Sequence, residues 1–161
     1  MAIRNIVKKG DEILRKRSKE VKEINDKIRE LFDDMKETLY NTGNGIGLAA
    51  PQVGILKRMI VIDLGDGTGP MEIINPVILK QEGEQVDVEG CLSVPGVYGE
   101  VKRPAHMVVE YTNIDGKKVK VDATGLLARC LSHEIDHLDG ILFTDKVIRY
   151  VDPEELEKKE Q

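Results

Sequence analysis

The sequence lacks the features that mark secreted, membrane-spanning and nucleic-acid-binding proteins. Two cysteines are too few for a disulfide framework, and no apolar run is long enough to cross a bilayer. The apolar stretch in residues 1–9 is too short for a signal peptide, and acidic residues follow at once. A formal net charge of −5 argues against a generic nucleic-acid surface. We therefore expect a cytoplasmic protein without membrane contact or direct nucleic-acid recognition, whose cysteines remain thiols available to a metal.

Length and composition predict a single globular domain. The chain has 161 residues, of which 40% are hydrophobic and 33% are charged, so it can bury a sizeable core. No repeat, linker or low-complexity segment interrupts it. We expect one domain over residues 1–161, ending in an acidic tail at 152–161.

Two helices are expected from the pattern of apolar residues. These residues recur at helical spacing over 28–39, and Asn25 can cap the helix, which should run to about Thr42. A second helix is expected towards the C-terminus, with Thr124 as its cap and Gly140 just after its end.

Strands are expected between the two helices. Alternating or β-branched runs predict them at 59–64, 72–79, 85–89, 107–111 and 118–121, with an Asp-Gly hairpin turn joining the last two. Pro76 places the second of these strands at a sheet edge or at a bulge. The order predicts an α+β fold: short antiparallel strands in curved sheets, packed around a C-terminal metal-binding helix, with a long N-terminal helix.

Two of the three histidines stand at the spacing of metal ligands. His133 and His137 are four residues apart, and Glu134 directly follows the first. On a helix, positions i and i+4 share one face, so both imidazoles can reach one metal ion while Glu134 lies beside it. The alternative is an amphipathic helix with two ordinary histidines, but the spacing around a glutamate favours a metal site.

A catalytic site of this kind needs a third protein ligand and an open position. A metzincin would place histidine where this chain has Phe143, so that class is excluded. A thermolysin-like peptidase would use a later glutamate, and Glu154, Glu155 or Glu157 could serve, although they stand in a charged tail. A non-catalytic metal-binding domain is the rival from a different class of protein.

The two cysteines are the other candidates for the third ligand. Cys130 and His137 are seven residues apart, which is about 10.5 Å along a helix axis, so Cys130 is better read as a buried thiol. Cys91 follows a predicted strand and could be brought beside the helix by the fold. The residues alone leave it open whether Cys91 is a ligand or a small buried apolar residue.

A segment of small and apolar residues at 45–54 contains a single polar side chain, Gln52. Glycines in such a segment often mark a close approach of backbone or ligand. The segment could be a tight turn with a packed strand, in which Gln52 holds a loop, or Gln52 could face a site, because a buried amide needs partners.

Three stretches together resemble the motifs of the peptide deformylase family, in that family's order and across nearly the whole chain. They are Gly45-Ile46-Gly47-Leu48-Ala49-Ala50-Pro51-Gln52, Glu89-Gly90-Cys91-Leu92-Ser93 and His133-Glu134-Ile135-Asp136-His137. The resemblance implies that Cys91, His133 and His137 bind the metal and that Glu134 is the general acid/base. It implies that Gln52 and the Leu92 backbone N–H stabilise the oxyanion. The substrate groove and methionine pocket would be formed by Ile46, Gly47, Gly90, Leu126, Arg129 and Cys130, and Glu89 and Arg103 would form an ion pair behind the metal.

The resemblance also implies an activity, a cofactor and partners. The reaction would be metal-dependent hydrolysis of the N-formyl group from N-formylmethionyl nascent polypeptides, with release of formate. The native metal would be Fe²⁺, and a thiolate with two imidazoles also suits Zn²⁺, Ni²⁺ or Co²⁺. Some bacterial members dock on the ribosome through a long basic C-terminal helix. Here residues 152–161 carry five acids and two lysines, a charge of −3, which puts that docking mode in doubt.

Overall fold

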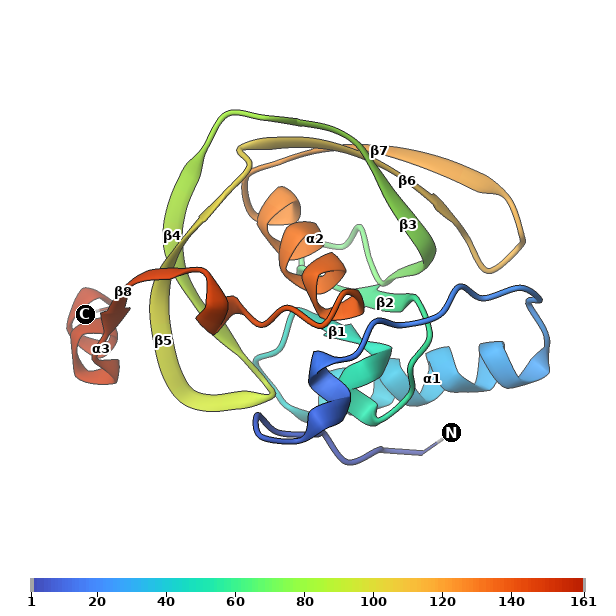
Figure 1. Cartoon of the computed structure of the whole chain (residues 1–161), viewed down its shortest axis with the longest axis horizontal. Helices are drawn as coiled ribbons and strands as arrows, with labels where there is room; N and C mark the ends of the chain where they lie inside the picture. The colour runs from blue at the N-terminus through green and yellow to red at the C-terminus, as the bar shows by residue number, and fades with distance from the viewer. Residues whose placement is uncertain (1, 161) are drawn as a thin grey trace.

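The computed structural model describes residues 2–160, and it has the expected α+β architecture (Figure 1). The helices are α1 (Asp26–Asn41), α2 (Gly125–Leu138) and α3 (Pro153–Glu160), with short 3-10 turns η1 (Glu12–Arg15), η2 (Ala50–Val53) and η3 (Phe143–Asp145). The strands are β1 (Gly47–Ala49), β2 (Met59–Ile62), β3 (Met71–Glu82), β4 (Gln85–Cys91), β5 (Val94–Arg103), β6 (His106–Thr112), β7 (Lys118–Thr124) and β8 (Val147–Val151). No helix within this range is long and apolar enough to span a membrane.

The strands form two antiparallel sheets that curve around α2. The larger has the order β1-β2-β3-β6-β7 and the smaller has the order β4-β5-β8. Short connections lead from β3 into β4 and from β5 into β6, and α2 leads from β7 to β8, so the chain passes three times between the sheets. Figure 1 shows α2 enclosed by these strands, with β4 and β5 on one side and α1 below β1 and β2.

Helix α1 forms where the apolar spacing predicts it. The Asn25 side chain caps the helix by accepting a hydrogen bond of 3.1 Å from the Ile28 N–H. Its apolar face is buried against β1, β2 and the η2 turn, and the buried apolar residues are Ile28, Leu31, Phe32, Met35 and Leu39. The helix supports the strand and turn that carry the first sequence motif.

Helix α2 is the central element of the fold. Ten of its 14 residues are buried, and Leu131, Ile135 and Leu138 pack into the core of the larger sheet. Thr124 occupies the cap position, but its side chain makes no capping hydrogen bond, so the predicted cap interaction is wrong. The expected end just before Gly140 is confirmed, because the helix ends at Leu138. The φ of Gly140 is +77°, and a Cβ there would lie 2.5 Å from the Arg15 carbonyl oxygen.

The strand predictions were right in kind but incomplete. Pro76 lies at a bulge, because β3 pairs with strands on both sides and its register with β6 shifts between Ile74 and Val77. Strand β1 lies in the 45–54 segment, for which a packed strand with a tight turn was one of the two alternatives, whereas no pattern predicted β5 or β8. Strand β5 was not predicted because Pro95, Gly96 and Gly99 interrupt the alternating pattern of apolar residues that is typical of a strand. Pairing with β4 and β8 stabilises the strand despite its weak local preference for extended structure.

Candidate active site

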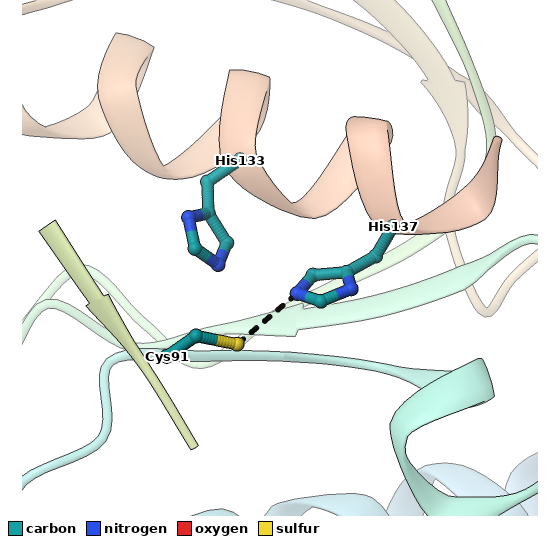
Figure 2. Close-up of side chains that lie close together, drawn as sticks. All are labelled: Cys91, His133 and His137. Atoms are coloured by element: carbon teal, nitrogen blue, oxygen red, sulfur yellow. Dashed lines mark hydrogen bonds between the residues drawn. The ribbon is translucent and has the colours of Figure 1, made fainter. Parts of the chain in front are cut away.

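Two segments far apart in the chain bring three metal-type donor atoms together (Figure 2). Cys91 ends β4, while His133 and His137 project from one face of α2, and the donor atoms of all three lie within 4.8 Å of one another. The Cys91 Sγ is 3.3 Å from the His137 Nε2. The helix thus places its two imidazoles on one side of the cluster, and the strand places the thiol on the other.

This donor set fits a divalent metal ion. Bond lengths of about 2.3 Å to sulfur and about 2.0–2.1 Å to nitrogen separate tetrahedral ligand atoms by roughly 3.3–3.6 Å. The 3.3 Å between the Cys91 Sγ and the His137 Nε2 falls in this range. One thiol and two imidazoles suit zinc, ferrous iron, nickel or cobalt. Cys130 lies outside this cluster; burial raises the pKa of its thiol to about 12, so it remains protonated.

The orientation of His133 is fixed by a carboxylate behind it. Its Nδ1–H donates a hydrogen bond of 2.8 Å to Glu89, which leaves Nε2 for the cluster. Burial alone would raise the pKa of Glu89, but hydrogen bonds from Arg103 and His133 outweigh burial and lower the pKa to about 2. The carboxylate is therefore charged at neutral pH, and it holds the histidine as metal-ligating histidines are commonly held.

A buried ion network surrounds Glu89. Arg103 is 2% exposed and makes the ion pair with Glu89 that was expected, through two hydrogen bonds of 2.8 Å. Its remaining nitrogen donates to Asp136 at 2.6 Å, and Arg129 also contacts Glu89. Asp136 is a partner that was not predicted, although it stands inside the His-Glu motif, one helical turn after Ser132 and beside His137.

Gln52 both holds a loop and faces the site, so the two alternatives left open by the sequence apply together. Its side chain is 1% exposed, and its Oε1 accepts a hydrogen bond of 2.9 Å from the Ala49 N–H. Its Nε2 donates to the Ser93 Oγ at 3.2 Å and lies 3.5 Å from the Cys91 Sγ. Ser93 was missed as a functional residue; its position two residues after Cys91 was the available signal.

Glu134 lies against the backbone of β1. A Cβ at Gly47 would come within 2.6 Å of the Glu134 Oε2, so glycine there provides the space for the carboxyl group. Burial is the main cause that raises the pKa of Glu134 to about 7, and its Oε1 has no hydrogen-bond partner in the described part of the chain. A carboxyl group with such a pKa can accept and release a proton near neutral pH.

A cavity of about 580 Å³ opens beside these groups. The residues that the sequence analysis assigned to a substrate groove all line it: Ile46, Gly47, Gly90, Leu126, Arg129 and Cys130. Leu92 lines it too, in the turn between β4 and β5, and β5 adds Val97 and Tyr98, which sequence reasoning missed together with their strand. The cavity is thus bordered by all three motifs.

An α+β fold that gathers a Cys-His-His cluster, a buried glutamate and an amide at one cavity has the design of a metallohydrolase. A sequence model of the polypeptide deformylase family matches residues 3–152. The peptide deformylase of Acetivibrio thermocellus is 62% identical over 161 residues, covering 100% of this chain and 93% of the relative. The peptide deformylase of Caldicellulosiruptor bescii is 57% identical, covering 99% of this chain and 94% of the relative.

Solved structures agree with the sequence comparison. The crystal structure of peptide deformylase from Thermotoga maritima superposes with a TM-score of 0.88 at 40% identity, covering 91% of this chain and 99% of that one. The peptide deformylase from Ehrlichia chaffeensis in complex with actinonin gives a TM-score of 0.87 at 38% identity, covering 100% and 99%. The chain belongs to the polypeptide deformylase family, and it is a hydrolase that removes the formyl group from nascent polypeptides.

Proposed function

We propose that Cys91, His133 and His137 bind one divalent metal ion, natively Fe²⁺, with Zn²⁺, Ni²⁺ or Co²⁺ as substitutes. The convergence of the three donor atoms within 4.8 Å supports this assignment. When bound, the metal supplies a Lewis acid that makes water nucleophilic at neutral pH. Glu89 holds the His133 ring through the hydrogen bond to Nδ1, which leaves Nε2 as the atom that would hold the metal.

Glu134 is the general base and then the general acid. Its buried carboxyl group lines the same cavity as Cys91 and His133, so a water molecule in that cavity can be its partner. It accepts the proton of the attacking water and returns it to the nitrogen that leaves as the free amino terminus. Formate is the other product.

Gln52 and the Leu92 N–H stabilise the negative charge that develops on the formyl oxygen. The amide of Gln52 is held at both ends, by Ala49 and by Ser93, with its Nε2 close to Cys91. A donor fixed in this way needs no rearrangement when charge develops, and losing one such donor typically slows a reaction by about 10²–10³-fold.

The cavity receives the N-formylmethionine end of the nascent polypeptide. Its walls combine apolar side chains with small residues, which suits an unbranched apolar side chain, and the contacts come from Ile46, Gly47, Gly90, Leu126, Arg129 and Cys130. The acidic segment 152–161 does not suit a basic docking helix for the ribosome.

The single observation that carries this proposal is the placement of Glu134 beside the Cys-His-His cluster at one cavity. Glu134→Gln tests it, because glutamine keeps the shape but cannot accept the proton. We expect bound metal and folding to be retained while kcat for formate release from a formylmethionyl peptide falls by about 10²–10⁴-fold. A variant purified without metal would instead make Glu134 a ligand. Full activity would remove its catalytic role.

A further inference from the structure

The first residues of the chain form no helix or strand, yet their backbone is held at short intervals. Figure 1 shows this segment in blue, running along the lower edge of the molecule towards η1. The Ala2 N–H donates to the Asp34 carboxylate at 2.7 Å, and the Arg4 N–H donates to the Thr38 Oγ1 at 2.9 Å. These contacts anchor the segment to α1. Residues 6–9, which we call the N-terminal strap, then reach the candidate active site.

Two backbone hydrogen bonds of the N-terminal strap end on the turns that carry the proposed oxyanion donors. The Val7 N–H donates to the carbonyl of Gln52 at 2.7 Å, and the Lys9 N–H donates to the carbonyl of Ser93 at 2.8 Å. Gln52 supplies one donor through its side chain, and Leu92, the residue before Ser93, supplies the other through its N–H. The strap therefore links the η2 turn to the β4–β5 turn.

The side chains of the strap alternate between the cavity and the η2 turn. Ile6 and Lys8 line the cavity, and the Lys8 Nζ donates to the Leu92 carbonyl at 3.4 Å. Val7 packs on the other side, where its Cγ2 would lie 4.0 Å from a Cβ at Gly54, directly after the η2 turn. Such alternation is typical of extended backbone. The strap is thus a wall of the cavity as well as a link between two turns.

The same two turns are also joined in the interior. The Gln52 Nε2 donates to the Ser93 Oγ at 3.2 Å, and these residues are 1% and 0% exposed. The strap lies nearer the surface, because Val7 is half-buried and Lys9 is exposed. Two residues of extended chain span about 6.6 Å, so the strap also sets the separation of the carbonyls that it contacts. Links at two depths restrain the rotation of the turns as well as the distance between them.

We propose that Val7 and Lys9 position the two oxyanion donors through their backbone N–H groups. The inference rests on the functions proposed above for Gln52 and for the Leu92 N–H. Such donors lower the barrier only when they are fixed where the negative charge develops. A misplacement of about 1 Å, caused by a change away from the reacting atoms, can slow a reaction on the order of 10²-fold. Val7 and Lys9 are positioning residues, because they act through the donors.

The test removes each N–H of the strap in the full-length protein. Val7→Pro and Lys9→Pro do so, because proline has no backbone donor. Val7→Ala and Lys9→Ala are conservative variants that shorten the same side chains but keep the N–H. Asn5→Pro is the matched control, since the Asn5 N–H in the same segment has no hydrogen-bond partner among the described residues. Each variant is assayed for formate release from a short formylmethionyl peptide, for metal content and for Tm.

We expect Val7→Pro and Lys9→Pro to lower kcat by about 10–100-fold, while both alanine variants and Asn5→Pro stay within about twofold of wild type. KM should change by less than about threefold, since the side chains of Ile6 and Lys8 are unaltered. Metal content and Tm should match those of Asn5→Pro. A protein in which the α-hydroxy acid of valine replaces Val7 exchanges only the N–H for an ester oxygen, and it should show the same loss of kcat.

A double-mutant cycle with Gln52→Ala separates positioning from general support of the fold. If Val7 acts through Gln52, its N–H has little left to position once the amide is removed. Val7→Pro should therefore lower kcat by less than about threefold in the Gln52→Ala background, although it lowers kcat much more in the wild-type background. A change that merely loosened the fold would lower kcat by the same factor in both backgrounds.

Four results would overturn the proposal. Proline variants and an ester variant as active as Asn5→Pro would show that the strap positions nothing. Equal factors in the two backgrounds would show that Val7 does not act through Gln52. Loss of metal together with kcat would place the effect at the metal site. Full activity of Gln52→Ala would refute the proposed function of that residue and this inference with it, whereas a slow Gln52→Ala beside a fully active Val7→Pro would refute the inference alone.

Discussion

Replacing Arg103 with methionine tests the buried ion network behind the proposed metal site. The Arg103 side chain is 1% exposed and donates two hydrogen bonds to Glu89, each 2.8 Å long, and one of 2.6 Å to Asp136. Methionine keeps an unbranched chain of similar reach but removes every donor. The variant therefore leaves two carboxylates in or near the core with fewer cationic partners.

The structure sets the size of the expected loss. Removing one partner of a buried ion pair typically destabilises a protein by about 3–5 kcal/mol, because the other charge remains buried. In this network Glu89 keeps Arg129 and His133 as partners, and Asp136 keeps Lys146 at 2.9 Å. We therefore expect Arg103→Met to lower the free energy of unfolding by about 3 kcal/mol, at the lower end of that range.

Urea unfolding of metal-free protein at pH 7, followed by circular dichroism, measures this loss. The matched control is Arg149→Met, because Arg149 pairs with Glu100 at 3.1 Å on the surface and is 52% exposed. Exposed pairs contribute about 0–1 kcal/mol, so the control should change little. An Arg103→Met variant as stable as the control would refute the reasoning that this pairing is costly to break.

The same variant has a second readout at the metal. Arg103 positions Glu89, and Glu89 holds His133 through the hydrogen bond to Nδ1. Loss of a partner that orients a metal-ligating histidine typically weakens metal affinity by about 10–100-fold. Competition against a chelator measures the affinity. An unchanged affinity would separate the network from the proposed metal site.

Three further predictions concern single groups. Cys91→Ala should lose metal and activity together, while Cys130→Ala keeps most of its metal. The metal content of both purified variants tests this, and the reverse pattern would overturn the assignment of Cys91 as the third ligand. The ring of His106 meets Glu82 at 2.9 Å and Asp122 at 2.6 Å, and hydrogen bonds to these carboxylates raise the pKa of His106. Its pairing therefore stabilises the fold fully below the unfolded pKa of about 6.5 and is lost as pH rises through the higher folded pKa. The difference in Tm between wild type and His106→Asn should thus shrink from pH 6 to pH 9, and a constant difference would contradict this. Finally, the iron form should lose activity in air faster than the nickel or zinc form, because ferrous iron and thiolate are both oxidisable. Mass spectrometry should detect oxidation of Cys91 in the iron form. Equal loss of activity in all three forms, with Cys91 unmodified, would count against an iron–thiolate centre.

Local patterns predicted the elements whose formation depends on local physics. The apolar face of α1 and the cap at Asn25 lie within a few turns of one another, so spacing alone located the helix. The β6–β7 hairpin was found for the same reason, because an Asp-Gly turn joins two alternating runs. Strand β5 was missed because one of its two hydrogen-bond partners, β8, ends about 50 residues further along the chain. Pairing at that distance leaves no local signal.

In the candidate site, too, local spacing predicted some residues, while others depend on contacts between distant parts of the chain. The spacing of His133 and His137 could be read as a metal pair because a helix fixes their geometry locally. Cys91 could not be told from a small apolar residue by such reasoning, since it stands 46 positions before His137 and only the fold of β4 against α2 brings the two side chains to 3.3 Å. The family resemblance supplied that link, because three motifs in one order imply a shared fold.

The family resemblance did not supply the physical reason for each residue of the site. That Gly47 makes room for Glu134 follows only from the contact between β1 and α2. That Ser93 holds Gln52 follows only from the contact between the η2 turn and the β4–β5 turn. The site is specified by pairs of residues on different elements, and each pair becomes interpretable only when both elements are in place.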